Sequence, residues 1–278
     1  MKKINRRSFL AAAGLTAAAL ALTACGGSAS STASSTASSA ASSEAASTSA
    51  AAELTTVEAG KLTMATNAAF PPYEMTTDAG EFEGIDIDTA KAIAEKLGLE
   101  LHIDDMDFDA ALLSVQQGKA DIVMAGVTVT DERKAVMDFS DSYATGIQSI
   151  IVPEGSDITS PDDLAGKKIG TQRGTTGYIY CSDDFGDDAV VAYDDGLTAV
   201  QALNNGQVDA VVIDNAPAKE FVAANPGLVI LDTSYAEEDY AIGLAKGSAL
   251  EDAVNAALEE LKADGTLQSI VDKYITAE

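Results

Sequence analysis

The chain has 278 residues, of which 46% are hydrophobic and only 5% aromatic, and its formal net charge is −27. This length exceeds one ordinary domain, and the composition predicts a soluble α/β protein of two domains with an aliphatic core. The strong negative charge makes nucleic acid and anionic membrane surfaces poor partners, and it serves solubility more readily than electrostatic steering.

The first 24 residues are typical of an export signal. A basic segment at 2–7 precedes an apolar, alanine-rich stretch at 9–22, and residues 22–25 read Leu-Thr-Ala-Cys. This combination resembles a bacterial lipoprotein signal, whose cleavage leaves Cys25 as a lipid-modified N-terminus and takes the net charge from −27 to −31. The pair of arginines in the basic segment also resembles a twin-arginine export motif, although Asn5 replaces the usual hydroxyl residue and a plain basic segment explains the pair more simply.

A Ser/Ala/Thr/Gly segment follows Cys25 and extends to residue 52, with Glu44 as its only charge. This composition cannot bury enough apolar surface to fold, so residues 25–58 are predicted to form a lipidated N-terminus and a flexible tether of roughly 30 Å. No later apolar run reaches the ~18 residues of a membrane helix. With Cys181 as the other cysteine and His102 as the single histidine, we expect no intramolecular disulfide, metal site or cofactor.

The folded part is predicted to begin with a strand at 61–66, followed by a loop that two prolines keep extended. A hairpin-like stretch around 80–85 precedes a helix that starts at Asp86 or Asp88 and ends at Gly98. A second strand is expected at 99–103.

A second helix is predicted to start beside Phe108 and to end at Gly118. An aromatic residue at that helix start belongs either to the core or to a pocket wall. The next strand, at 121–125, is short, apolar and β-branched, as a buried parallel strand should be.

The segment GVTVTDER at 126–133 joins that strand to another helix. Gly126 allows a close backbone approach, and Thr130 followed by two acidic residues signals a helix start. Unpaired backbone N–H groups, the hydroxyls of Thr128 and Thr130 and the Arg133 guanidinium together suit a small anion such as a carboxylate. The alternative is that Arg133 pairs with an acidic residue, Asp131 or Asp138, on the helix surface.

The pattern of 112–125 is repeated at 200–213: both copies read helix, glycine, aspartate and buried strand, which predicts two similar αβ lobes. In the second copy, Asp214 stands where the strand ends and a helix begins, a position that a capping aspartate also explains.

Further elements are predicted around and after this second copy. Ser160 opens a short capped helix, and a strand at 168–171 leads into a Gly/Thr-rich turn. A strand is expected at 228–231, and residues 241–245 are expected to cross between the lobes. Ser248 and Glu251 predict a capping box for the next helix, and one more amphipathic helix ends the chain.

Six segments closely resemble the polar amino acid receptors of bacterial ABC importers, the extracellular solute-binding proteins of family 3. The likeness begins near residue 62 and keeps the family's order and spacing to the C-terminus. The segments are ATNAAFPPYE (65–74), GIDIDTAKAIAEKLG (84–98), DFDAAL (107–112), AGVTVTDERKAVMDFSDSY (125–143), GTTGY (174–178) and VDAVVIDNAP (208–217).

The resemblance implies an α/β fold of the two-lobed periplasmic-binding-protein type (type II), in which each lobe is a mainly parallel sheet flanked by helices. Lobe 1 would comprise residues 59–149 and 241–278, and lobe 2 residues 150–240. The ligand would lie in the cleft between the lobes, at the carboxyl ends of the strands.

The resemblance also implies roles for nine ligand-binding residues. Arg133 would hold the ligand's α-carboxylate with Thr128, Thr176 and the backbone at Gly126, and Asp214 would pair with its α-ammonium. Phe70 and Phe108 would pack about the ligand's side chain, and Asn67 and Gln172 would reach its far end.

Receptors for lysine or arginine often carry an acidic residue at the position of Asn67, so we expect an uncharged amino acid such as glutamine, with arginine or another polar amino acid as alternatives. The expected partners are this ligand, ABC permease subunits and, through the lipid at Cys25, the outer face of the cytoplasmic membrane; the protein is expected to be monomeric. Two other functions stay open: an enzyme on the same scaffold, similar to cyclohexadienyl dehydratases, and an extracellular amino acid sensor.

Overall fold

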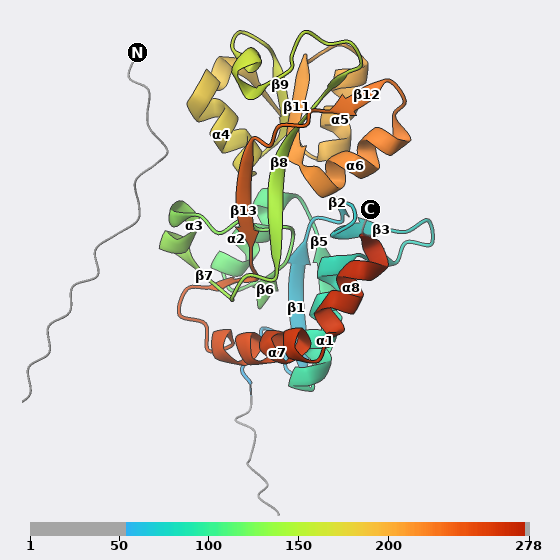
Figure 1. Ribbon diagram of the computed structural model, residues 1–278. Coiled ribbons are helices and arrows are strands. Elements are labelled where there is room, and N and C mark those ends of the chain that lie inside the picture. Colours follow the sequence, from blue (N-terminus) through green and yellow to red (C-terminus); the bar gives the residue numbers. More distant parts are fainter. Residues whose placement is uncertain (1–53, 276–278) are drawn as a thin grey trace, which may run out of the picture. The chain divides into compact units, whose positions relative to one another are not determined.

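The structure is a computed structural model that describes residues 54–275 (Figure 1). These residues form two α/β lobes, each built on one mixed β-sheet. The predicted signal peptide, Cys25 and nearly all of the tether lie outside the described residues. Within the described range, no helix is both long enough and apolar enough to cross a membrane.

The first lobe is built on a sheet with the strand order β5-β1-β6-β14-β7. Strand β1 pairs in parallel with β5 and β6, whereas β14 runs antiparallel to β6 and β7. A small antiparallel sheet, β2-β3-β4, follows β1 in the chain. The strands are β1 (Lys61–Thr66), β2 (Ala69–Phe70), β3 (Glu74–Thr76), β4 (Phe82–Glu83), β5 (Glu100–Asp105), β6 (Ile122–Val123), β7 (Met137–Phe139) and β14 (Gly243–Ala245).

Helices cover both faces of this sheet because its strands are apolar on both sides. Leu62 and Met64 of β1 pack into the core formed with α1, α7 and α8, whereas Ala65 packs into the core formed with α2. This alternation follows from the two-residue period of a strand. The helices are α1 (Ile85–Leu97), α2 (Phe108–Gln116), α3 (Asp131–Val136), α7 (Glu251–Ala263) and α8 (Thr266–Tyr274).

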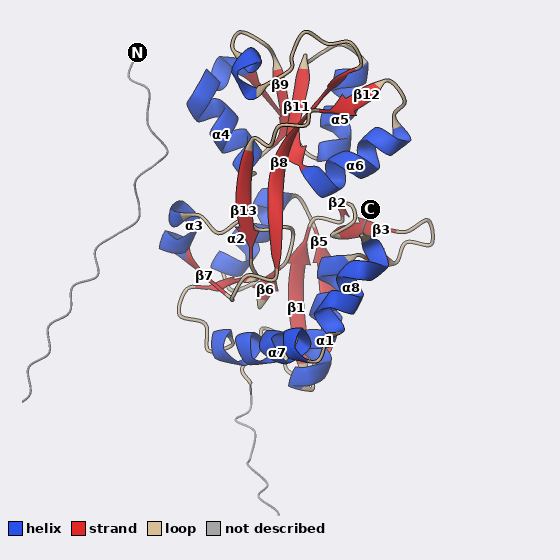
Figure 2. Cartoon of the chain, viewed as in Figure 1, coloured by secondary structure: helices blue, strands red, loops and turns tan. Residues whose placement is uncertain are grey.

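The second lobe has the strand order β10-β9-β11-β8-β12, with β13 also paired to β8. Helices α5 and α6 pack on one face, and α4 and the short 3-10 helix η1 pack on the other (Figure 2). The elements are β8 (Ala144–Pro153), β9 (Ile169–Gln172), β10 (Val190–Tyr193), β11 (Ala210–Asp214), β12 (Leu228–Ile230), β13 (Ala236–Tyr240), η1 (Pro161–Leu164), η2 (Asp187–Ala189), α4 (Thr176–Phe185), α5 (Gly196–Asn204) and α6 (Asn215–Ala224).

Two antiparallel strands connect the lobes. The chain leaves the first lobe along β8 and returns along β13, and the two strands pair from Ala144 with Tyr240 to Gln148 with Ala236 (Figure 1). An isolated bridge between Thr128 and Tyr240 ties this pair to the first lobe. The connection is therefore a two-stranded ribbon.

The predicted repeat is confirmed, and the same side chain has the same role in both copies. Asp121 accepts a hydrogen bond from the backbone N–H of Thr63 at 2.8 Å, and Asp209 accepts one from Lys168 at 2.8 Å. Each aspartate thus satisfies the beginning of the neighbouring parallel strand, which explains why an acidic residue precedes each buried strand.

Three local predictions are wrong. The crossing strand is β13, whereas 241–245 contributes β14 to the first sheet. Ser248 forms no capping box with Glu251; its hydroxyl instead accepts from the backbone of Leu250 at 3.2 Å. Helix α1 begins at Ile85, and Asp86 is buried inside it.

The predicted two-lobed α/β fold is confirmed. Each sheet is mixed, because it contains antiparallel strands beside three parallel ones. The exact lobe boundaries stay a prediction.

Candidate functional site

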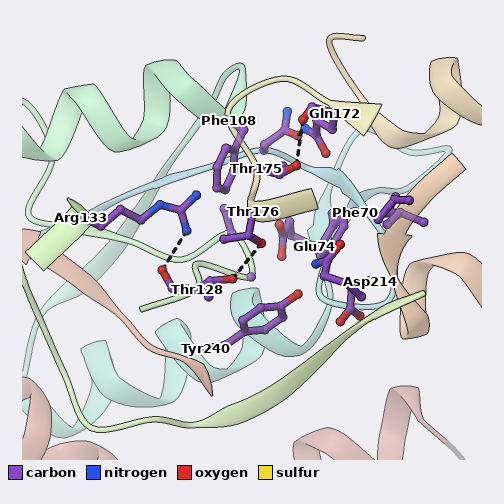
Figure 3. A pocket seen from close by; sticks show the side chains of 16 residues that line it. Phe70, Glu74, Phe108, Thr128, Arg133, Gln172, Thr175, Thr176, Asp214 and Tyr240 are labelled. Atoms are coloured by element: carbon purple, nitrogen blue, oxygen red, sulfur yellow. Dashed lines mark hydrogen bonds between the residues drawn. The ribbon is translucent and has the colours of Figure 1, made fainter. Parts of the chain in front are cut away.

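A pocket lies between the lobes, at the carboxyl ends of β1, β6, β9 and β11. Figure 3 shows the side chains that line it. It encloses about 440 Å³, counting its open mouth. All nine residues selected from the sequence line it: Asn67, Phe70, Phe108, Gly126, Thr128, Arg133, Gln172, Thr176 and Asp214. The other lining residues are Glu74, Ala125, Gln148, Thr175, Val212, Ile213 and Tyr240.

Arg133 brings a buried positive charge to this pocket. Thr130 caps helix α3 by accepting from the backbone N–H of Arg133 at 3.2 Å, which fixes the first turn. The guanidinium donates to the carbonyl of Thr128 at 2.8 Å and to that of Gly174, in the other lobe, at 3.1 Å. Burial lowers the pKa of Arg133 and the charge of Glu238 opposes this effect, but an arginine stays protonated. Its other N–H groups remain available to an anion.

The predicted alternative for Arg133, an ion pair on the helix surface, is wrong. Asp138 pairs with Lys246 at 2.6 Å, and Arg133 is only 8% exposed. The guanidinium carbon lies 5.3 Å from the centre of the Phe108 ring, within the range of a cation–π contact. Phe108 also packs in the core under α2, so it serves both as core residue and as pocket wall.

Two hydroxyl groups, one from each lobe, meet beside Arg133 in the pocket (Figure 3). The Oγ1 atoms of Thr128 and Thr176 are 3.4 Å apart. Both hydroxyls donate to Oε2 of Glu238, at 3.1 and 3.0 Å, and Gln148 Nε2 donates to the same oxygen at 3.0 Å. The site therefore contains a buried carboxylate that the sequence analysis did not select.

Asp214 is at once a helix cap and a pocket residue. Its carboxylate accepts from the backbone of Ala216, in the first turn of α6, at 3.0 Å and from that of Ile147 on β8 at 2.7 Å. Burial raises the pKa of Asp214 to about 6, with the two backbone donors acting against the shift. At neutral pH the group is mainly ionised, so it supplies a negative charge that faces the pocket.

Asn67 and Gln172 meet across the two lobes at another part of the pocket. Gln172 Nε2 donates to Asn67 Oδ1 at 2.8 Å and to the carbonyl of Asp194 at 3.3 Å, and Asn67 Nδ2 donates to the carbonyl of Met106 at 3.0 Å. Both N–H groups of Gln172 are thus in use, whereas its Oε1 accepts no hydrogen bond within residues 54–275. This end of the pocket therefore offers two acceptors, Gln172 Oε1 and the remaining lone pair of Asn67 Oδ1, and one donor, the second N–H of Asn67 Nδ2.

Gly126 is required by close packing. Its φ of +55° lies in the left-handed region, and a Cβ atom there would stand 2.9 Å from the Phe70 ring and 3.2 Å from the Tyr240 ring. Its N–H donates to Asp86 at 3.0 Å. Gly126 therefore shapes the pocket, and its N–H is already hydrogen-bonded to Asp86. That the backbone at Gly126 helps to hold a carboxylate stays a prediction.

An aromatic and acidic wall lies beside Gly126. Phe70 stacks on Tyr73 with ring centres 5.8 Å apart, and Tyr73 meets Tyr240 edge-on at 5.4 Å. Glu74 is fully buried, and neither of its carboxyl oxygens has a hydrogen-bond partner in the described part of the chain. Burial, reinforced by the charge of Asp86, raises the pKa of Glu74 well above its usual range. Burial therefore favours the neutral form of this carboxyl over the ionised form.

Sequence reasoning missed Glu74, Gln148, Glu238 and Tyr240. The last three lie on β8 and β13, and because the crossing segment was placed at 241–245, no signal directed attention to them. Glu74 ends the segment ATNAAFPPYE, directly after a loop that was expected to reach the pocket. Its position directly after this loop was the one sequence signal that could have identified Glu74 as a pocket residue.

The comparison with known proteins agrees with this architecture. The family model of bacterial extracellular solute-binding proteins, family 3, matches residues 62–277. The chain belongs to this family. The resemblance seen in the sequence motifs is thus confirmed.

Relatives of this solute-binding protein carry related descriptions. A probable histidine-binding protein of Neisseria gonorrhoeae is 32% identical over 283 residues, which cover 99% of this chain and 98% of the relative. The arginine-binding extracellular protein ArtP of Bacillus subtilis is 33% identical over 230 residues, 78% of this chain and 87% of ArtP. A solved structure, an ancestral arginine-binding protein bound to glutamine, is 43% identical with a TM-score of 0.75 and covers 78% of this chain and 99% of the other.

Proposed function

We propose that this solute-binding protein captures a free amino acid between its lobes and delivers it to the permease of an ABC importer. One observation carries the proposal: Arg133 from the first lobe and Asp214 from the second line the same pocket with opposite charges. An amino acid zwitterion has the complementary charges on its carboxylate and ammonium groups, which are attached to the same α-carbon. The relatives named for histidine and arginine binding support the same class of ligand.

The geometry supports separate binding sites for the two charged groups of the ligand. Arg133 and the hydroxyls of Thr128 and Thr176 are the donors for the α-carboxylate, and the ionised Asp214 is the acceptor for the α-ammonium. Each charge-assisted hydrogen bond of this kind contributes roughly 1.5 to 3 kcal/mol. Because the two charges belong to different lobes, a bound zwitterion favours the closed arrangement over an open one.

The far end of the pocket favours a ligand side chain that can both donate and accept hydrogen bonds, because the second N–H of Asn67 Nδ2 is a donor beside two acceptors. Gln172 Oε1 and the remaining lone pair of Asn67 Oδ1 are acceptors, and both side chains are uncharged. The amide of glutamine matches this pattern, and we propose glutamine as the ligand. Arginine, whose guanidinium is also a donor, is the second candidate, whereas the carboxylate of glutamate lacks the donor that these groups require.

Titration calorimetry tests this proposal. Protein that has been unfolded and refolded, to remove any copurified ligand, is titrated with each of the twenty amino acids. We expect glutamine to bind with a Kd in the micromolar range or tighter, roughly −8 kcal/mol or better, arginine to follow, and glutamate to be rejected. Absence of detectable binding for all twenty amino acids would refute the proposed function.

A matched pair of arginine variants tests the assigned role of Arg133. Arg133→Met should weaken binding at least about 100-fold, because it leaves the ligand's carboxylate without its charged partner. Arg173→Met is the control, since this arginine follows Gln172 in the chain but does not line the pocket, and its side chain is 56% exposed. Equal binding by both variants would remove Arg133 from the site.

Transport, rather than catalysis or sensing, is the role we propose for the captured ligand. Release of product from a cyclohexadienyl substrate would instead establish the enzyme alternative, and an unaltered uptake rate in a deletion strain would favour a sensor. The proposed lipid anchor predicts that Cys25→Ala protein leaves the membrane fraction and becomes soluble outside the cytoplasm.

A further inference from the structure

The carboxylate of Glu238 occupies the same hydroxyl donors that the proposed function assigns to the ligand. Its Oε2 accepts from Thr128 at 3.1 Å and from Thr176 at 3.0 Å. Its other oxygen, Oε1, is buried and accepts no hydrogen bond from the residues described. At 6% exposure, the side chain has little access to solvent that could compensate.

A threonine hydroxyl has one proton and can donate it to one acceptor at a time. When Thr128 and Thr176 donate to Glu238, they cannot also donate to a ligand carboxylate. Glu238 thereby imitates the ligand: it gathers one donor from each lobe, and its negative charge acts on Arg133. It does so from β13, one of the two strands that connect the lobes.

We propose that Glu238 is an internal competitor for the ligand's α-carboxylate, which weakens binding and hastens release. To bind, the amino acid accepts the two hydroxyl hydrogen bonds that Thr128 and Thr176 otherwise donate to Glu238, which keeps the hydrogen bond from Gln148 Nε2. The ligand's carboxylate also enters beside a like charge. Both effects lower the affinity below the value that Arg133 and Asp214 alone would give. The weaker binding speeds release of the ligand to the permease.

The decisive variant is Glu238→Gln, because a neutral amide is a weaker acceptor and removes the like charge. Hydrogen bonds to an ionised acceptor are roughly twice as strong as neutral ones, so we expect the amino acid to bind about tenfold tighter and to dissociate more slowly. Glu237→Gln is the matched control: it makes the same charge change on the neighbouring residue of β13, whose side chain is exposed. Its Kd should stay within about twofold of wild type.

A double-mutant cycle separates competition from a structural role. In a Thr176→Val background one contested hydroxyl is missing, so the gain from Glu238→Gln should shrink, whereas a purely structural effect would be unchanged. Glu238→Asp shortens the side chain, moves the carboxylate away from both hydroxyls and should also tighten binding. This variant tests the competitor role if Glu238→Gln does not fold.

The outcomes are distinguishable, because the inference rests on the proposed function and can fail independently of it. Calorimetry and stopped-flow dissociation are measured on variants with a wild-type thermal transition. Unchanged or weaker binding by a folded Glu238 variant overturns the competitor role while the wild type still binds. Absence of amino acid binding by the wild type overturns the proposed function itself.

Discussion

Replacing Asp214 by asparagine tests the electrostatic half of the site. The substitution removes the charge proposed to face the ligand's ammonium and nearly preserves the shape of the side chain. Asparagine can still cap α6 by accepting from Ala216, although its amide nitrogen then faces the N–H of Ile147. The change should therefore alter binding much more than it alters folding.

The effect of the substitution on folding stability follows from the burial of Asp214. The pKa of Asp214 is raised to about 6, so the folded protein holds this proton more tightly than the unfolded chain. The contribution to stability is thus favourable at low pH and is lost as the pH rises from about 4 to about 6, at a cost of about 3 kcal/mol. In Asp214→Asn, the stability gained by removing a buried charge offsets the stability lost with the backbone hydrogen bond from Ile147.

The effect on binding follows from the lost contact with the ligand. A charge-assisted bond to the ammonium is worth roughly 1.5 to 3 kcal/mol, so Asp214→Asn should weaken binding about 10- to 150-fold.

The same pKa predicts how affinity depends on pH. Protonated Asp214 cannot pair with an ammonium, so affinity should fall as the pH drops below 6 and should be about tenfold lower at pH 5 than at pH 7.5. Burial also raises the pKa of Asp86 to about 6, so the difference between wild type and Asp214→Asn is the informative quantity.

Calorimetry at the two pH values, with thermal denaturation as a check on folding, provides the assay. Asp195→Asn is the matched control, because Asp195 caps α5 in the same lobe but does not line the pocket. Asp214→Asn protein that is folded, binds as tightly as wild type and keeps the full pH dependence would refute the reasoning.

Two further predictions concern the closed arrangement and selectivity. Gly174→Ala should weaken binding about threefold, since a Cβ atom would clash with the carboxylate of Asp109 in the other lobe, and this exposed side chain must rotate away for the lobes to close. Gly166→Ala has a similar positive φ and no neighbour within 4 Å, so it should cost only about 1 to 2 kcal/mol of stability. Equal affinities in these two alanine variants would argue against closure at Gly174. Gln172→Glu removes the donor to Asn67 and adds a negative charge, so glutamine should bind more weakly and arginine more tightly; competition calorimetry that finds an unchanged ratio would count against the far-end assignment.

The fold was predictable wherever its signals are local. Strand β1 and the Thr130 cap of α3 were predicted at the observed positions, because apolar patterning and capping act over a few residues. Strand β13 was not, because its sequence AEEDY is acidic and exposes alternate residues. Its pairing with β8, more than eighty residues away, depends on tertiary contacts that no local pattern contains.

The site was predictable from strand ends and family motifs. Asn67, Gln172 and Asp214 each lie at or just after the end of a parallel strand, and this placement brought the selected side chains to one pocket. The network around Glu238 was not predictable, because its donors come from three separate segments. The sequence also could not show that the Gly126 N–H is already committed to Asp86.

The proposed function requires one zwitterionic ligand to bridge charges of opposite sign on the two lobes, and chemical derivatives of the ligand test this requirement. Calorimetry compares the tightest-binding amino acid with its α-carboxamide, which lacks the anion, and with its N-acetyl derivative, which lacks the cation. We predict that each derivative binds the wild-type protein at least about 100-fold more weakly than the parent. Parent-like affinity for either derivative would contradict the account.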